Sequence, residues 1–334
     1  MKDTLDFIVI GAQKAGTTSL FEYLRHHPQL SMPADKEAPY FSHDPLFARG
    51  WRDYMARIAL VDPERRWGTV TPHYMVGGVY KRVRAQAEAA GGYDERTVPL
   101  RIHERLPDVR LIAILRDPVA RARSHHQMML MNGFERRSFD EAIEELLRPD
   151  ALERSRRQPG EGTGYVTWSE YRRILGGYYD VFAPEQILVG FTEELERSPE
   201  QLLTRVHDFL GVSSDFVPEN LGVRYRTGGT ERRVSWMSPN RTMSPQGLKR
   251  KLMRSSTARA TWRLLPRASR LRIKRDYDHL GYRVDLWNRR TRAGAGQPSP
   301  ETVERLREHF AEEADELAAL IGANPPWLAP RTAE

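Results

Sequence analysis

The stretch Asp6-Phe-Ile-Val-Ile-Gly-Ala-Gln-Lys-Ala-Gly-Thr-Thr-Ser-Leu-Phe-Glu-Tyr-Leu24 decides the fold. Phe7 to Ile10 is a short apolar run, long enough for one buried strand and too short for a helix. Gly11 and Gly16 divide the loop that follows, and apolar residues then recur at helical spacing up to Leu24. A strand, a glycine loop and a helix N-terminus together aim several backbone N–H groups at one anion. The stretch therefore predicts a phosphate-binding loop.

The lysine of this loop is misplaced for a nucleoside-triphosphate P-loop. That motif has its lysine directly after the second glycine, whereas here Thr17 follows Gly16 and the only cation of the loop is Lys14. A lysine at this place lies beside a phosphate chain instead of reaching forward to a γ-phosphate. The alternative is a tight turn with an incidental lysine, which the hydroxyl residues after Gly16 disfavour.

Gly11-Ala-Gln-Lys-Ala-Gly-Thr-Thr-Ser-Leu20 closely resembles the 5′-phosphosulfate loop of sulfotransferases that use 3′-phosphoadenosine 5′-phosphosulfate (PAPS). The likeness is strongest to the heparan-sulfate sulfotransferase-like branch and its bacterial relatives. The resemblance implies that Lys14 contacts the bridging oxygen and the 5′-phosphate. It also implies that the following residues wrap the phosphate oxygens, namely Ala15, Gly16, Thr17, Thr18 and Ser19.

A second segment resembles the family's 3′-phosphate motif, Arg-(Asp/Asn)-Pro-x-x-Arg-x-x-Ser. Leu111 to Leu115 is an unbroken apolar run that suits a strand buried on both faces, and Arg116-Asp-Pro-Val-Ala-Arg-Ala-Arg-Ser124 follows it. The resemblance implies that Arg116 and Ser124 bind the 3′-phosphate, for which a charged arginine fork and a hydroxyl are suitable donors. The other arginines fit exposed positions on a capped helix: Arg121 and Arg123.

The segment Lys36-Glu37-Ala-Pro-Tyr-Phe41 resembles the family's Lys-Glu-x-x-(aromatic)-Phe pattern, whose glutamate is the proposed general base. A carboxylate suits this role, because a hydroxyl that attacks sulfur must lose its proton as the S–O bond forms. Lys36 could help to hold the sulfuryl group. The pair taken by itself is better explained as a solvated charge pair, and the phosphate loop before it and the aromatic residues after it favour the base.

The segment Arg66-Trp-Gly-Thr-Val-Thr-Pro-His-Tyr-Met75 resembles the family's second strand and the turn after it. Some relatives carry Gly-Glu-Lys-Ser-Pro here, but Thr69 and Val70 replace the Glu-Lys pair, so no second catalytic lysine is implied. His73 is an alternative base to Glu37 in the acceptor pocket, although a lone histidine is more often structural.

Near the C-terminus the resemblance is partial. The family's Lys-Gly-Arg cofactor loop falls on Thr291-Arg-Ala293, where Arg292 could keep part of the role. Residues 193–211 are expected to form one helix that stops at Gly211. Caps are predicted at Asp117, before Pro118, and at Ser299, before the closing helix.

Composition limits the possible functions. The 334 residues are long enough for a full core, and the net charge of +7, from 52 basic and 45 acidic residues, suits an anionic cofactor. Cysteine is absent, which excludes disulfides and thiolate metal sites. No signal peptide and no run of about 18 apolar residues is visible. We therefore expect a soluble, cytoplasmic protein without a membrane span.

The expected fold is a three-layer α/β/α sandwich with a central parallel sheet, a P-loop-like PAPS-binding loop and a helical C-terminal part. We expect a single sulfotransferase domain, with an α/β core over 1–215, a helical or basic variable segment over 216–297 and a closing helix within 298–328. Such an enzyme, of the EC 2.8.2 type, would transfer the sulfuryl group of PAPS to an acceptor hydroxyl, or less readily to an amine, and release 3′,5′-ADP. The acceptor would be a small molecule, glycan, lipid or glycosylated natural product, with no metal and no nucleic acid involved.

Two other functions stay open from the sequence. One is a P-loop-type kinase with a displaced lysine, which would need ATP and Mg²⁺. The other is a non-catalytic module that binds nucleotides or polyanions, which the basic segment 224–275 suggests.

Overall fold

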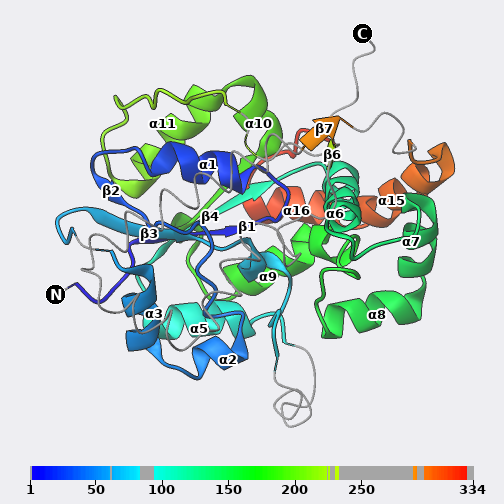
Figure 1. Cartoon of the computed structure of the whole chain (residues 1–334), viewed down its shortest axis with the longest axis horizontal. Coiled ribbons are helices and arrows are strands. Elements are labelled where there is room, and N and C mark those ends of the chain that lie inside the picture. Colours follow the sequence, from blue (N-terminus) through cyan, green and yellow to red (C-terminus); the bar gives the residue numbers. More distant parts are fainter. Residues whose placement is uncertain are drawn as a thin grey trace. The chain divides into compact units, whose positions relative to one another are not determined.

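The computed structural model describes residues 2–60, 62–82, 94–223, 225, 230–232, 289–291 and 297–328. At its centre is a five-stranded parallel sheet with the order β2-β3-β1-β4-β5 (Figure 1). The strands are β1 (Phe7–Gly11), β2 (Leu30–Ser31), β3 (Arg66–Val70), β4 (Arg110–Leu115) and β5 (Ile187–Phe191). The predicted parallel sheet is confirmed, and the two apolar runs, Phe7 to Ile10 and Leu111 to Leu115, lie in β1 and β4.

The order in which the chain adds strands to the sheet reverses at β1, although all the strands are parallel. Strands β3 and β2 lie on one side of β1, and β4 and β5 lie on the other. All five residues of β1 are buried. In open α/β sheets, ligands bind beyond the carboxyl ends of the strands at such a reversal. The glycine loop follows β1 directly, so it lies at the place where this rule expects a ligand.

Helices cover both faces of the sheet (Figure 1). One face carries α1 (Thr17–Leu24), α10 (Thr192–Arg197) and α11 (Pro199–Leu210). The other carries α3 (Trp51–Ile58), α5 (Thr97–Arg105) and α9 (Tyr171–Tyr179). The predicted three-layer arrangement is therefore confirmed.

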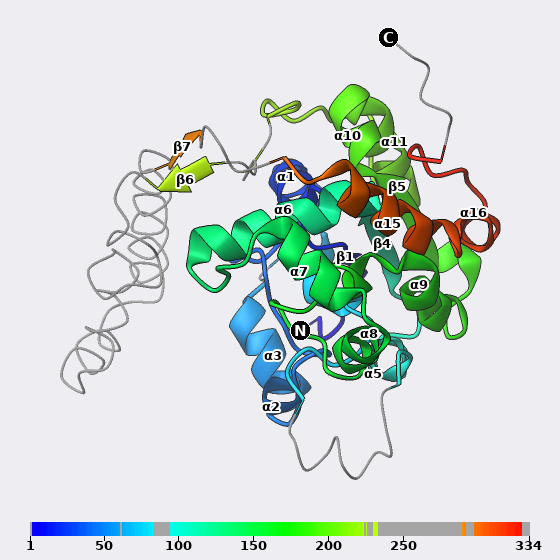
Figure 2. The same ribbon diagram turned by 90° about the vertical axis from the view of Figure 1, so that its right-hand side faces the viewer.

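The remaining helices and turns complete this part of the chain. They are α2 (Asp44–Phe47), α6 (Pro118–Asn132), α7 (Phe139–Leu146), α8 (Pro149–Arg157), α15 (Pro300–Ala311), α16 (Ala314–Ile321) and the 3₁₀ turns η1 (Pro72–Met75), η2 (Thr167–Ser169) and η3 (Pro184–Gln186). Figure 2 shows α15 running beside α7 and α16 beside α9. Arg172 of α9 pairs with Glu316 of α16 at 3.2 Å. The C-terminal helices thus pack on the core.

The predicted helix ends are mostly confirmed. The Asp117 carboxylate accepts a hydrogen bond from the Ala120 N–H at 2.7 Å, and the Ser299 hydroxyl accepts one from the Thr302 N–H at 3.1 Å. The single helix expected over 193–211 is wrong. It is two helices, α10 and α11, because Pro199 forces the preceding residue out of helical geometry.

The chain divides into two compact units. The first contains Met1–His126, Arg137–Arg226 and Pro298–Glu334, and the second contains Gln127–Arg136 and Thr227–Gln297. In the second, β6 (Thr230–Arg232) pairs antiparallel with β7 (Arg289–Thr291). Arg292 and most of the basic segment 224–275 lie outside the described residues.

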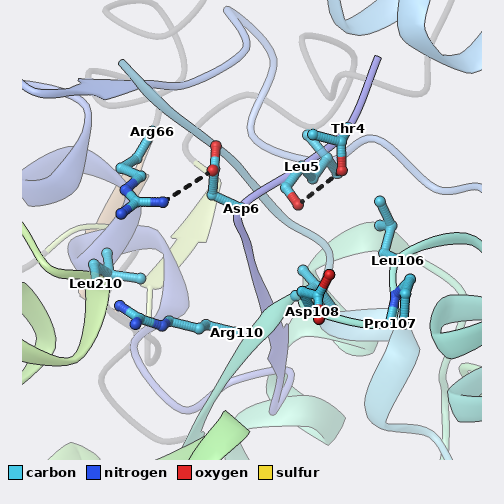
Figure 3. Close-up of a pocket in the computed structure, with 10 residues that line it drawn as sticks. Thr4, Leu5, Asp6, Arg66, Leu106, Pro107, Asp108, Arg110 and Leu210 are labelled. Carbon is cyan, nitrogen blue, oxygen red and sulfur yellow. Dashed lines mark hydrogen bonds and ion pairs between the residues drawn. The ribbon is translucent and has the colours of Figure 1, made fainter. Parts of the chain in front are cut away.

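A cavity of about 260 Å³ lies at the amino ends of β1, β3 and β4 (Figure 3). Its two arginines are engaged within the protein. Arg66 donates to the Asp6 carboxylate at 3.3 Å, and Arg110 donates to the Phe209 carbonyl at 2.5 Å. This cavity lies at the opposite edge of the sheet from the glycine loop, and we assign it no ligand.

Candidate active site

The loop between β1 and α1 has the backbone shape of an anion-binding nest. Lys14 has a φ of +71° and Gly16 a φ of +87°, both in the left-handed region. Left-handed residues in such a loop turn neighbouring N–H groups toward one side. A Cβ on Gly16 would also lie 2.8 Å from the Leu195 side chain, so only glycine fits there. Lys14 has a β-carbon and still adopts this conformation, which is a local strain of the kind found at functional sites.

Neighbouring strands hold this loop in place. The Ala12 N–H donates to the Ile114 carbonyl of β4 at 2.7 Å. The Thr192 hydroxyl, at the end of β5, lies within hydrogen-bond distance of the carbonyls of Ala15 (3.0 Å) and Leu115 (2.9 Å). The ends of β1, β4 and β5 are therefore tied together, and Thr192 has a positioning role that the sequence did not indicate.

The two segments that resemble cofactor motifs meet at this edge. The Arg116 guanidinium, at the end of β4, donates to the Lys14 carbonyl at 3.1 Å. The Arg116 carbonyl in turn accepts a hydrogen bond from the Tyr171 hydroxyl at 3.0 Å. Ser124 lies on α6 and is buried. Residues more than 100 positions apart in the sequence thus form one polar cluster.

Arg121 is fully buried, and its expected exposure is wrong. Its guanidinium donates to the Gly164 carbonyl at 3.0 Å, to the Tyr165 carbonyl at 2.7 Å and to the Ser169 hydroxyl. Burial lowers the pKa of Arg121 to about 10, and it remains charged at neutral pH. Arg121 therefore fastens the segment after α8 to α6.

The hydroxyl residues after Gly16 begin α1. Thr17 and Ser19 are buried, and Thr18 is half-buried. The Ser19 hydroxyl accepts a hydrogen bond from the Tyr225 N–H at 3.2 Å. Ser19 therefore also holds the segment after α11, and its hydroxyl keeps its own O–H to donate.

The two candidate bases lie next to each other. One carboxylate oxygen of Glu37 is 3.9 Å from His73 Nδ1, and the other is 3.4 Å from the Lys36 ammonium. The Glu37 side chain is 39% exposed, so an acceptor can reach it. The Tyr74 hydroxyl accepts a hydrogen bond from the backbone N–H of Tyr40, and this contact holds the segment that contains Glu37.

Sequence reasoning missed Glu161, which lies in the glycine-rich loop after α8. Its carboxylate accepts hydrogen bonds from His73 Nε2 at 3.0 Å, from His125 Nε2 at 3.1 Å and from Gln13 Nε2 at 3.2 Å. The Tyr80 hydroxyl is 3.5 Å away. An acidic residue among the glycines of residues 158–164 was the only signal, and it gave no indication of these partners.

The protonation states of this cluster follow from its surroundings. Burial alone would raise the pKa of Glu161, but the hydrogen bonds from His125 and His73 outweigh it and hold that pKa well below its usual range. Burial lowers the pKa of His125 to about 4, so this ring is neutral at pH 7. Arg121 lies 3.4 Å from His125 Nδ1 and can only donate, which leaves the ring hydrogen on Nε2, facing Glu161.

Comparison with known proteins places the chain in a family. A family model described as the sulfotransferase domain matches residues 4–223, and the chain belongs to this family. The chain is 28% identical over 214 residues to mouse heparan sulfate glucosamine 3-O-sulfotransferase 3B1, covering 61% of this chain and 45% of the relative. It is 27% identical over 210 residues to human heparan sulfate glucosamine 3-O-sulfotransferase 6, covering 61% and 52%. The chain thus spans about half the length of these curated relatives.

A solved structure supports the fold. The chain resembles the crystal structure of a sulfotransferase from Alicyclobacillus acidocaldarius with a TM-score of 0.61 and 22% identity, covering 96% of this chain and 97% of that one. The kinase alternative is not favoured, because the matching family is a sulfotransferase family. Among the residues that the structure describes, no cluster of His, Asp or Glu suits a metal ion. None of the described helices has the length and apolarity that a membrane span requires.

Proposed function

We propose that this chain transfers the sulfuryl group of PAPS to a hydroxyl group of an acceptor. The observation that carries this proposal is the hydrogen bond between Arg116 and the Lys14 carbonyl, which joins the two cofactor-like motifs at the carboxyl edge of the sheet. Family membership supports the same reaction.

The residues present fit the sulfuryl donor. The loop from Lys14 to Gly16 and the first residues of α1 would offer backbone N–H groups and hydroxyls to the 5′-phosphosulfate, and Lys14 would balance the charge that develops on the departing phosphate. Arg116 and Ser124 would hold the 3′-phosphate. Holding both ends of the nucleotide fixes the sulfur against the acceptor, which is a large part of the rate in such reactions.

Glu37 is the proposed general base. It is the more exposed of the two candidates and belongs to the segment that resembles the family's base motif. His73 stays an alternative, because its Nδ1 lies only 3.9 Å from the Glu37 carboxylate. The acceptor hydroxyl would give its proton to one of these groups as the new S–O bond forms.

A glycan is the first acceptor class to test, because the relatives named above are heparan sulfate glucosamine sulfotransferases. Small phenols and lipid alcohols are the other acceptor classes. We also propose that the protein acts in the cytoplasm. The assay follows ³⁵S from labelled PAPS into a panel consisting of a glucosamine oligosaccharide, 4-nitrophenol and a long-chain alcohol.

Substitution of the base provides the test. Glu37→Gln should retain 3′,5′-ADP affinity within about threefold and lose transfer by ~10²-fold or more, which is the usual contribution of a general base. Exposed Glu104 on α5, changed to Gln, is the matched control and should transfer like the wild type. Normal transfer by Glu37→Gln would instead assign the base to His73.

A further inference from the structure

One carboxylate joins three parts of the candidate active site. Glu161 accepts hydrogen bonds from Gln13, His73 and His125. Gln13 belongs to the loop after β1, His73 to the turn after β3, and His125 to the helix after β4. Glu161 itself comes from the segment after α8, which Arg121 fastens in place. It therefore lies where the donor loop and the candidate bases meet.

Glu161 also determines which nitrogen of His73 carries a hydrogen. An ionised carboxylate only accepts, so His73 Nε2, at 3.0 Å, must donate to it. In the neutral ring the other nitrogen, Nδ1, is then an acceptor, and it lies 3.9 Å from the Glu37 carboxylate. The His73 ring also stacks on Tyr80, with ring centroids 4.3 Å apart and an angle of 22° between the planes. This stacking further restricts the orientation of the His73 ring.

We propose that Glu161 is a positioning residue, which holds His73 with Nδ1 toward Glu37 so that Glu37 can pass on the proton it takes from the acceptor. This inference rests on the proposed sulfuryl transfer. The acceptor oxygen bonds to sulfur as the bond from sulfur to the 5′-phosphate oxygen breaks, and that oxygen keeps the electron pair. The acceptor proton goes to Glu37 and then to His73 Nδ1. The imidazolium that results keeps its Nε2–H on ionised Glu161, which stabilises it.

The arrangement returns Glu37 to its ionised form within the same turnover. Without His73 in this orientation, Glu37 would have to release its proton to water. Glu161 is already bound by donors from Gln13, His73 and His125, and the proposal gives it no contact with the acceptor. Glu161 thus acts through His73 and not on the substrate.

Several titratable groups surround His73 and shape any pH profile. They are Glu37 and Lys36 from the segment after β2, Tyr80 after η1, Glu161 after α8, and His125 with Arg121 on α6. Burial and the neighbouring Glu161 raise the pKa of Tyr80 to about 12, and His125 is neutral above pH 4. Tyr80 and His125 therefore each keep one protonation state between pH 5 and pH 9.

The test compares Glu161→Gln with His73→Gln and the double variant. Glu161→Gln should lower kcat ~10-fold or more and leave KM for PAPS and 3′,5′-ADP affinity within about threefold. In the His73→Gln background, Glu161→Gln should lower kcat no further. Equal losses in both backgrounds, or an unchanged kcat in the single variant, would overturn the proposal.

A matched control and an independent readout guard against a purely structural effect. Glu170 is another buried carboxylate, held by Arg156 and His309, and Glu170→Gln should lower the Tm and leave kcat within about threefold. In the wild type, ¹⁵N NMR of the His73 ring at pH 8.5 should show the hydrogen on Nε2, and a hydrogen on Nδ1 would overturn the proposal whether or not the variants fold. If the wild type itself transfers no sulfuryl group to any acceptor, it is the proposed function that fails and not this inference alone.

Discussion

Gly16 is a residue whose backbone and surroundings both require glycine. Its φ is +87°, and a Cβ would meet the Leu195 side chain at 2.8 Å. Gly50, at the start of α3, has almost the same φ, +82°, but a Cβ there would meet nothing within 4 Å. Substituting each of these two glycines therefore separates the effect of backbone strain on stability from the effect of a displaced phosphate loop on nucleotide binding.

We expect Gly16→Ala to lower 3′,5′-ADP affinity at least ~10-fold and stability by about 1–3 kcal/mol, because an L-residue is strained at this φ. Gly50→Ala should lose at least as much stability, because its φ of +82° with a ψ of 163° is a backbone region that only glycine populates, and it should keep full affinity. Calorimetric titration and urea unfolding measure both quantities. Equal affinity in the two variants would show that the shape of the loop is not what binds the nucleotide.

At the same scale, the sequence predicted some residues well and others not at all. Glu37 and His73 were separate candidates, and the structure brings them to 3.9 Å. Glu161 was missed because nothing in a glycine-rich loop indicates which distant side chains it will reach. Arg121 was expected to be exposed because arginine usually is, but the three acceptors that it binds come from a segment 43 to 48 positions away.

At the scale of elements, Arg121 attaches α6 to the segment before α9. Arg121→Met should remove the donors to the Gly164 and Tyr165 carbonyls and leave them buried without partners. The expected loss is about 3 kcal/mol, the usual size when buried polar groups lose their partners. Urea unfolding measures it. Arg148→Met is the control, since Arg148 is 59% exposed, and it should change stability by less than about 0.5 kcal/mol. Equal losses would mean that Arg121 does not fasten this segment.

The sequence predicted strands better than helix boundaries. A buried parallel strand needs a short apolar run, and such runs predicted β1 and β4. The break between α10 and α11 was missed because the periodicity continues across it, while Pro199 alone decides the backbone there. The resemblance placed both cofactor-like motifs, but the contact between Arg116 and Lys14 depends on the sheet order and needed the structure.

At the scale of the molecule's first compact unit, Glu170 joins the C-terminal helices to the core. Its buried carboxylate is bound by Arg156 of α8, Arg173 of α9 and His309 of α15. Burial alone would raise the pKa of Glu170, but the hydrogen bonds from His309 and Arg156 and the charge of Arg173 outweigh it and lower the pKa to about 2.

A carboxyl group whose folded pKa is depressed stabilises the protein above its unfolded pKa and loses that contribution as the pH falls. Glu170 should therefore contribute about 3 kcal/mol at pH 7, which disappears between about pH 5 and pH 2. Glu170→Gln should be less stable than the wild type at pH 7, and the gap should close toward pH 2. Urea unfolding at several pH values checks this. A gap that stays constant with pH would contradict the assignment.

The central claim is that Lys14 and Arg116 bind opposite ends of one doubly phosphorylated adenosine. Calorimetric titration of the wild type, Lys14→Ala and Arg116→Ala with 3′,5′-ADP and with 5′-AMP tests it most directly. We expect one-to-one binding of 3′,5′-ADP by the wild type and weaker binding by both variants. Arg116→Ala should lose much less affinity for 5′-AMP than for 3′,5′-ADP, because 5′-AMP lacks the 3′-phosphate. An equal loss for both nucleotides in Arg116→Ala, or no saturable binding of 3′,5′-ADP by the wild type, would contradict the claim.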